Sequence, residues 1–254
     1  MSIDSRWLQD YNFIQMEEVD STNKEALNLA KAGVDNNHVI LAKKQTNGRG
    51  SQGRTWVSSA GNFYLSILLT DIDKVSDCFL FPFMAANVVY EAIAYFANES
   101  GVKADIKLKW PNDVLLNNKK IAGILVESIE IKGNCYVVIG IGINVENAPT
   151  IEARIIHPSF LANEGIFIKN KDHFLNFIVN NLHKKYTICQ KEKNFDFIRK
   201  DWLSRAYRLG EEITMVNNGR RIFGKFEDIS DIGEIGIRSL DGRLSYHNHG
   251  DITK

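Results

Sequence analysis

A glycine-rich loop between residues 45 and 54 carries the clearest chemical signal in the sequence. The loop has the sequence QTNGRGSQGR and combines three glycines with the guanidinium groups of Arg49 and Arg54. Glycine lets backbone N–H groups approach an anion closely, and arginine offers planar paired donors for a carboxylate or a phosphate. The loop is not a P-loop, because it lacks the P-loop spacing. It is not a dinucleotide-binding turn either, because no helix is expected to follow it. It predicts an anion-binding loop, with a surface turn as the alternative for the loop taken alone.

A second polar group, K-W-P-N-D, runs from Lys109 to Asp113. Because Pro111 disfavours helix in the preceding residue, Lys109 is expected to end a strand and to point to the face opposite Trp110. A solvated lysine at a strand end is the alternative for Lys109 alone. The neighbouring Asn112 and Asp113 add hydrogen-bonding groups and favour a ligand site.

Glycines inside apolar strands form the third signal. Gly140 and Gly142 interrupt the run Ile139 to Asn144, and Gly123 interrupts the run 121–126. Glycine within a strand often marks close approach of a ligand or another backbone, although backbone packing is the competing explanation at each position. The six histidines show no metal-ligand spacing, so no metal site formed by protein side chains is expected.

The elements that must position these groups follow from apolar periodicity and turn signals. Thr22 and Glu25 have the spacing of a capping box, which predicts a helix start there. Many short strands backed by helices predict an α+β fold with a mixed sheet. Strands are expected over 12–19, 38–44, 63–69, 106–110, 114–116, 120–131 and 135–143, and helices over 22–31, 75–99, 171–190 and 195–203.

After residue 208 the pattern changes to short β-prone runs. Asn217-Asn218-Gly219 and Asp241-Gly242 are strong hairpin signals. We expect residues 1–208 to form the larger domain and residues 209–254 to form a small β-barrel.

Composition narrows the classes of function. Lys plus Arg and Asp plus Glu both total 31, so the net charge is zero and the broad positive field of a general nucleic-acid binder is not expected. The N-terminus lacks an apolar signal-peptide core, and no apolar run is expected to be long enough to cross a membrane. Three widely spaced cysteines fit a reducing compartment. These features predict a cytoplasmic protein.

Taken together, the motifs resemble those of the biotin protein ligases in order and spacing, from about Asn12 to the C-terminus. The matching segments are D-S-T-N at 20–23, Gln45 with the loop to Trp56, K-W-P-N-D at 109–113, K-I-A-G-I-L-V-E at 120–127 and G-I-G-I-N at 140–144. The resemblance implies a catalytic domain like those of class II synthetases and biotin or lipoate ligases, followed by an SH3-like barrel.

The resemblance also implies a reaction and its participants. Biotin and ATP would give biotinyl-5'-AMP with the help of Mg²⁺, and a lysine of a biotin carboxyl carrier domain would then accept the biotinyl group. Lys109 and Arg49 would be catalytic. Biotin would contact Ser21, Thr22, Asn23, Gln45, Arg49, Gly50, Ser51, Trp56, Lys109, Gly123 and Leu125. ATP would contact Arg49, Arg54, Trp56, Asn112, Asp113, Lys120 and Asn144.

Two departures from the family pattern are visible. Only 19 residues precede Asp20, which are too few for the winged helix-turn-helix of repressor members, so sequence-specific DNA binding is not expected. Ser51 stands where well-known members carry a third arginine, which predicts a looser hold on the adenylate unless Arg54 or the Ser51 hydroxyl compensates. A lipoate or octanoate ligase of the same fold and a non-catalytic biotin sensor or repressor are the alternatives. The oligomeric state, including a homodimer, stays open.

Overall fold

The structure is a computed structural model that describes residues 10–72, 75–150, 156–192, 196–217 and 219–253. Three sequence expectations fall partly outside this range. They concern the N-terminal segment before residue 10, the first residue of the helix expected at 195–203, and the middle residue of the turn at 217–219.

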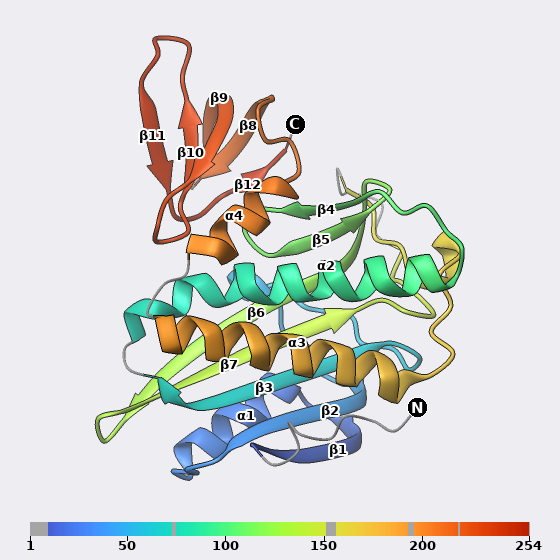
Figure 1. The fold of residues 1–254 in the computed structure, drawn as a ribbon. Coiled ribbons are helices and arrows are strands. Elements are labelled where there is room, and N and C mark those ends of the chain that lie inside the picture. Colours follow the sequence, from blue (N-terminus) through green and yellow to red (C-terminus); the bar gives the residue numbers. More distant parts are fainter. Residues whose placement is uncertain (1–9, 73–74, 151–155, 193–195, 218, 254) are drawn as a thin grey trace.

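A seven-stranded mixed sheet forms the larger part of the molecule (Figure 1). Its order is β1-β2-β3-β7-β6-β5-β4; β1 and β2 are parallel, and all other neighbours are antiparallel. The expected mixed sheet is therefore confirmed. The strands are β1 (Tyr11–Val19), β2 (Asn37–Gln45), β3 (Phe63–Ile72), β4 (Ile106–Lys109), β5 (Asp113–Leu116), β6 (Lys119–Ile131) and β7 (Asn134–Ile143).

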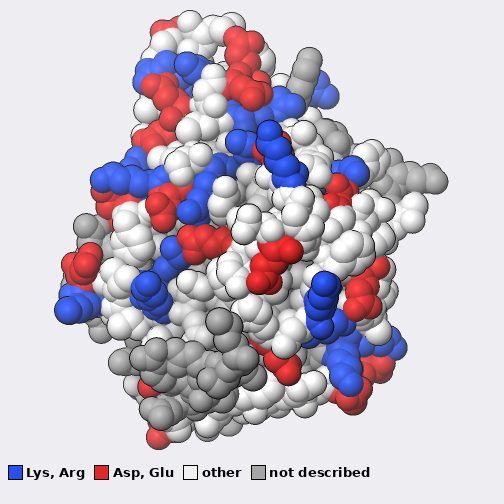
Figure 2. Space-filling view, turned by 45° about the vertical axis from the view of Figure 1, so that its right-hand side comes forward, with Lys and Arg blue, Asp and Glu red and all other residues white. Residues whose placement is uncertain are grey.

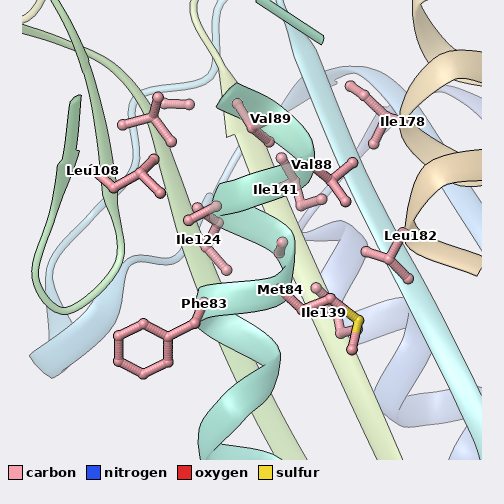
Figure 3. Packing of buried hydrophobic residues seen from close by; sticks show 14 of the residues in the cluster. Phe83, Met84, Val88, Val89, Leu108, Ile124, Ile139, Ile141, Ile178 and Leu182 are labelled. Carbon is pink, nitrogen blue, oxygen red and sulfur yellow. The ribbon is translucent and has the colours of Figure 1, made fainter. Parts of the chain in front are cut away.

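Helices cover both faces of this sheet. The helices α2 (Phe81–Glu99) and α3 (Lys171–Glu192) lie on one face, and α1 (Thr22–Lys31) packs on the other (Figure 1). Figure 3 shows Met84 and Val88 of α2 beside Ile139 and Ile141 of β7, within one buried cluster that also contains Leu182 of α3. The apolar run of α2 is therefore the central layer of the core.

The segment Cys78–Glu99 corrects one expectation from the sequence. It is long and apolar enough to cross a membrane by length and composition, although no such run was expected. However, 67% of its most apolar window is buried inside the protein. A helix covered on both sides is apolar all round for the same physical reason as a membrane span, so the burial identifies a core helix.

A five-stranded antiparallel sheet follows the short helix α4 (Asp196–Ser204). Its strands are β8 (Glu212–Asn217), β9 (Arg220–Ile229), β10 (Ile235–Arg238), β11 (Leu244–His247) and β12 (Asp251–Ile252). This agrees with the expected small SH3-like unit, while the boundary at 208/209 stays a prediction. The Trp110 indole donates a hydrogen bond of 3.0 Å to the Gly233 carbonyl, so the K-W-P-N-D segment touches this unit.

Two local expectations were wrong in detail. The helix expected over 75–99 is a 3-10 turn, η3 (Val75–Leu80), followed by α2. No capping box forms at α1: Ser21 is the N-cap, without a side-chain cap bond. Instead, the Gln45 side-chain oxygen accepts hydrogen bonds from the Thr22 N–H at 2.8 Å and the Thr22 hydroxyl at 3.1 Å. A side chain from β2 therefore takes the place of the local cap.

Candidate active site

A cavity of about 600 Å³, open to solvent, lies on the α1 side of the large sheet where α1 begins. Its lining comes from the start of α1, the loop after β2, and strands β3, β5, β6 and β7. The lining residues are Ser21, Thr22, Asn23, Gln45, Arg49, Gly50, Ser51, Arg54, Thr55, Trp56, Tyr64, Leu65, Asn112, Asp113, Lys120, Gly123, Ile124, Leu125, Gly140, Ile141 and Gly142.

Strand alternation explains why the glycines line this cavity. Val138 packs with α1, whereas Ile139 and Ile141 belong to the core beneath α2. Since side chains alternate along a strand, Gly140 and Gly142 face the α1 side. The glycines noted in the sequence thus leave the α1-facing surface of β7 free for other side chains to pack on.

The space beside these glycines is filled by the side chains of Asn23 and Trp56. A Cβ on Gly140 would lie 2.1 Å from Oδ1 of Asn23. A Cβ on Gly142 would lie 2.6 Å from the Trp56 ring, and one on Gly123 would lie 2.8 Å from the same ring. These positions need glycine because Asn23 and the Trp56 indole fill the space where side chains would be.

A hydrogen-bonded group of polar residues stands at the start of α1. The Ser66 hydroxyl lies 2.6 Å from Oδ1 of Asn23 and 2.8 Å from Oγ1 of Thr22. Gln45 accepts from Thr22, and its amide nitrogen donates 2.9 Å to the Ser58 hydroxyl. Thr22, Asn23 and Ser66 are all buried, so these contacts fix the polar side chains in one arrangement.

Trp56 and Lys120 separate this cavity from a second one of about 370 Å³. Both residues line both cavities, and the Lys120 ammonium lies 5.3 Å from the centre of the Trp56 ring, within cation–π range. The other lining residues of the second cavity are Thr55, Val57, Asn144, Pro149 and Pro158.

The three cations at the first cavity each contact one carboxylate. Arg49 Nη2 lies 2.6 Å from Glu127 Oε1. Arg54 Nη1 lies 3.3 Å from Asp251 Oδ1 in the C-terminal sheet. The ammonium of Lys120 lies 2.5 Å from Asp113 Oδ1.

Ser51 already has a partner within its loop. Nη2 of Arg54 donates a hydrogen bond of 2.9 Å to the Ser51 hydroxyl, and Nε donates one of 3.1 Å to the Ser51 carbonyl. Gln52 and Gly53 have positive φ angles of 58° and 71°, which fold the turn η2 (Ser51–Gly53) back on itself. The loop is therefore a tight turn, with the Arg54 guanidinium folded against it.

Lys109 is not part of the cavity lining, but it lies on the cavity side of the sheet, because Leu108 before it in β4 points into the core beneath α2. Its side chain is 8% exposed, and it makes no ion pair or hydrogen bond with the described part of the chain. Burial lowers the pKa of the Lys109 ammonium, while the nearby negative charges of Asp113 and Asp251 act in the opposite direction. Lys120 is the lysine among the described residues that line the cavity.

The structure brings the expected site residues together with two exceptions. All except Lys109 and Asn144 line the first cavity, and Asn144 lines the second. Asn144 is buried, and its Oδ1 has no hydrogen-bond partner in the described structure, so it keeps a free acceptor. Asn112 donates a hydrogen bond of 2.6 Å to the Ile124 carbonyl and joins β6 to the turn after Trp110.

Several residues at the site were not predicted individually. Ser66 and Glu127 lie far along the chain from Asn23, and they contact it only because β3, β6 and β7 are neighbours. Asp251 reaches Arg54 from the C-terminal sheet. Only Gly140 and Gly142 carried a sequence signal of their own. The unpredicted lining residues are Thr55, Tyr64, Leu65, Ile124, Gly140, Ile141 and Gly142.

Comparisons with known proteins agree with this architecture. Residues 16–144 match the model of the biotin/lipoate A/B protein ligase family. The chain is 35% identical over 232 residues to a biotin–[acetyl-CoA-carboxylase] ligase of Paracoccus denitrificans, covering 90% of this chain and 95% of that protein. It is 30% identical to a bifunctional ligase/repressor of Bacillus subtilis, covering 91% of this chain and 70% of the other. A biotin protein ligase of Aquifex aeolicus, solved with biotin and ATP, superposes with a TM-score of 0.76 at 28% identity, covering 95% and 97% of the two chains.

Proposed function

Because the chain belongs to the biotin/lipoate A/B protein ligase family, we propose that it is an enzyme that uses ATP to join biotin to a protein lysine. The observation that carries this proposal is the cavity itself. Its polar end at Thr22 and Asn23, its glycine-lined wall and its cations occur in one cavity. These features suit a ligand with a polar ring at one end and a carboxylate at the other.

The proposed reaction has two steps. In the first, a carboxylate oxygen of biotin attacks the α-phosphorus of ATP, the bond between the α-phosphorus and the bridging oxygen breaks, and pyrophosphate leaves with biotinyl-5'-AMP remaining. In the second, the neutral amine of a carrier lysine attacks the carbonyl carbon of this mixed anhydride. An amide bond forms, AMP leaves, and the amine loses one proton.

The two cavities give these ligands separate places. Biotin would lie in the first cavity with its ring near Asn23, and the nucleotide would extend past Trp56 into the second cavity, where Asn144 offers a free acceptor. Lys120 stands at the wall between the two. A fixed cation at the point where the carboxylate meets the phosphate stabilises the developing charge.

The expectation that Lys109 and Arg49 are catalytic stays a proposal, and the cavity adds Lys120 to these cations. Lys120, with Arg49, would contact the reacting oxygens, because both line the cavity. Lys109, which does not line the cavity, would act beside them through its charge. Its burial keeps that charge poorly screened by water and therefore effective over a short distance.

Mg²⁺ would accompany the triphosphate and supply charge neutralisation when pyrophosphate leaves. Among the described residues, no group of three or more His, Cys, Asp or Glu side chains is placed to hold a metal ion. Asp113 is the carboxylate among the described lining residues of the first cavity, and it is paired with Lys120. The oxygen ligands of Mg²⁺ would therefore come mostly from the phosphates of ATP and from water, as is usual for this cation.

We further propose that the acceptor is a biotin carboxyl carrier domain, that the enzyme works in the cytoplasm, and that it does not recognise a specific DNA sequence. The name of the Paracoccus denitrificans relative and the neutral net charge support these assignments. Biotin-dependent exchange of labelled pyrophosphate into ATP tests the first step without a carrier. Exchange that requires biotin supports the proposal, whereas exchange that requires lipoate instead would contradict it.

A further inference from the structure

Glu127 connects the polar end of the cavity to its cationic loop. It lies on β6, directly after the residues that form the cavity wall, and its side chain is 20% exposed. One carboxylate oxygen accepts a hydrogen bond of 2.9 Å from the Asn23 amide, and the other contacts Arg49 at 2.6 Å. Each oxygen therefore serves one of the two groups that face the ligand.

Asn23 is itself held firmly on the other side. Its amide nitrogen also donates to the Leu125 carbonyl at 3.2 Å, and its oxygen accepts from Ser66 at 2.6 Å. The side chain rests on Gly140, where a Cβ would not fit. A carboxylate fixed by such an anchored partner has a defined position from which to hold a second group.

Arg49 has no comparable anchor of its own. Its side chain is 42% exposed, and the contact with Glu127 is its single ion pair among the described residues. A guanidinium has five N–H donors, so contact through Nη2 leaves the other nitrogens available to an anion. Without Glu127 this long side chain would sample many rotamers in the loop.

We infer that Glu127 is a positioning residue that acts through Arg49, fixing the guanidinium so that its remaining donors meet the reacting carboxylate and phosphate. This role rests on the proposed function of Arg49 in adenylate formation. A cation held in place before the reaction lowers the barrier more than one that must be ordered during it. The same contact couples correct placement of Asn23 to correct placement of Arg49.

Pyrophosphate exchange with purified variants tests this role. Glu127→Gln keeps an acceptor for Asn23 but removes the charge that holds Arg49. We expect kcat to fall about tenfold, while the KM for biotin changes less than about threefold. Glu130→Gln on the same strand is the matched control, because Glu130 is exposed and makes no ion pair with the described residues, and we expect it to match the wild type.

A double-mutant cycle shows whether Glu127 acts through Arg49. We expect Arg49→Ala to lower kcat about a hundredfold, and Glu127→Gln to add little to that loss in the Arg49→Ala background. Multiplied losses in the double variant, or wild-type kcat in Glu127→Gln, would overturn the positioning role while wild-type exchange still supported the proposed function. An increase confined to the KM for biotin would also overturn it, because it would indicate an effect through Asn23 alone. Wild-type protein without biotin-dependent exchange would overturn the proposed function and this role together.

Discussion

At the scale of single residues, the buried ammonium of Lys109 differs from the other cations of the site because no carboxylate in the described part of the chain pairs with it. Lys109 is 8% exposed, and burial lowers its pKa, which means that the charged form is less stable in the folded than in the unfolded chain. Lys109→Met should therefore raise the free energy of unfolding by about 1 kcal/mol while lowering kcat roughly tenfold. Thermal unfolding and pyrophosphate exchange on the same samples measure both effects. Lower stability with unchanged turnover would show that the lysine has a structural role instead.

Ser51 is the loop residue that we expect to influence how firmly the loop holds the proposed reaction intermediate. Serine cannot add the positive charge that an arginine would bring to this position, although the Ser51 hydroxyl and Arg54 already contact each other. We expect Ser51→Arg to slow release of biotinyl-5'-AMP by roughly ten to a hundredfold, since a hydrogen bond to a charged group stabilises binding by about 1.5 to 3 kcal/mol. Release is measured by stopped-flow at fixed salt. An unchanged or faster release would mean that Arg54 and the Ser51 hydroxyl already supply the contact.

At the scale of elements, β7 needs a residue without a side chain at Gly140, because α1 places Asn23 against the strand there. A Cβ at Gly140 would lie 2.1 Å from Asn23 Oδ1 and would displace this side chain from Ser66 and Glu127. Gly140→Ala should weaken biotin binding by about tenfold or more, measured by titration calorimetry. In an Asn23→Ala background the same substitution should cost little more. Equal losses in both backgrounds would mean that the added methyl group blocks the ligand itself.

Glu164 ties the turn η4 (Leu161–Glu164) to the β5–β6 hairpin. Burial alone would raise its pKa, but hydrogen bonds from Asn117, Ser159, Lys119 and Asn163 outweigh this and lower it to about 2. A carboxyl group with a lowered folded-state pKa stabilises the fold above its unfolded value, 4.5, and this contribution is lost as the pH falls toward 2. Glu164→Gln should thus lower the free energy of unfolding by about 3 kcal/mol at pH 7.

Urea unfolding of Glu164→Gln and the wild type at pH 7, 4 and 3 checks this expectation. The difference between the two proteins should shrink steadily below pH 4.5. A difference that stays constant across this range would show that packing, rather than the carboxylate charge, stabilises the turn.

The order and approximate bounds of the elements could be predicted from the sequence because apolar periodicity and glycine turns are local signals. The contacts between distant strands could not. Thr22 and Glu25 have the spacing of a capping box, yet Gln45 from β2 takes the Thr22 N–H. Likewise, the sequence could not show that the pairing of β5 with β6 brings Lys120 beside Asp113 at the cavity, whereas the catalytic role of Lys109 stays a prediction.

At the scale of the whole molecule, the C-terminal sheet takes part in the site. Asp251 of β12 contacts Arg54, and the Gly233 carbonyl accepts from the Trp110 indole, so both the glycine-rich loop and the K-W-P-N-D segment touch it. A contact between the glycine-rich loop and β12 spans almost two hundred residues and had no sequence signal. The C-terminal unit therefore contacts both segments that carry the expected site residues.

The distribution of charged side chains bears on whether the protein binds nucleic acid. Acidic and basic side chains are interspersed over the face shown in Figure 2, and the net charge of the chain is zero. The net charge therefore gives the protein no broad positive field of the kind that attracts nucleic acid. The absence of sequence-specific DNA binding stays a prediction, as does the oligomeric state.

The most direct test of the account is intact-mass spectrometry of a biotin carboxyl carrier domain after incubation with the wild-type protein, biotin and Mg-ATP. We predict that the carrier mass rises by one biotinyl group, that the rise requires ATP, and that replacing the carrier's acceptor lysine abolishes it. The account would be contradicted if the biotin carrier domain stayed unmodified while the same protein transferred lipoate or octanoate to a lipoate carrier domain.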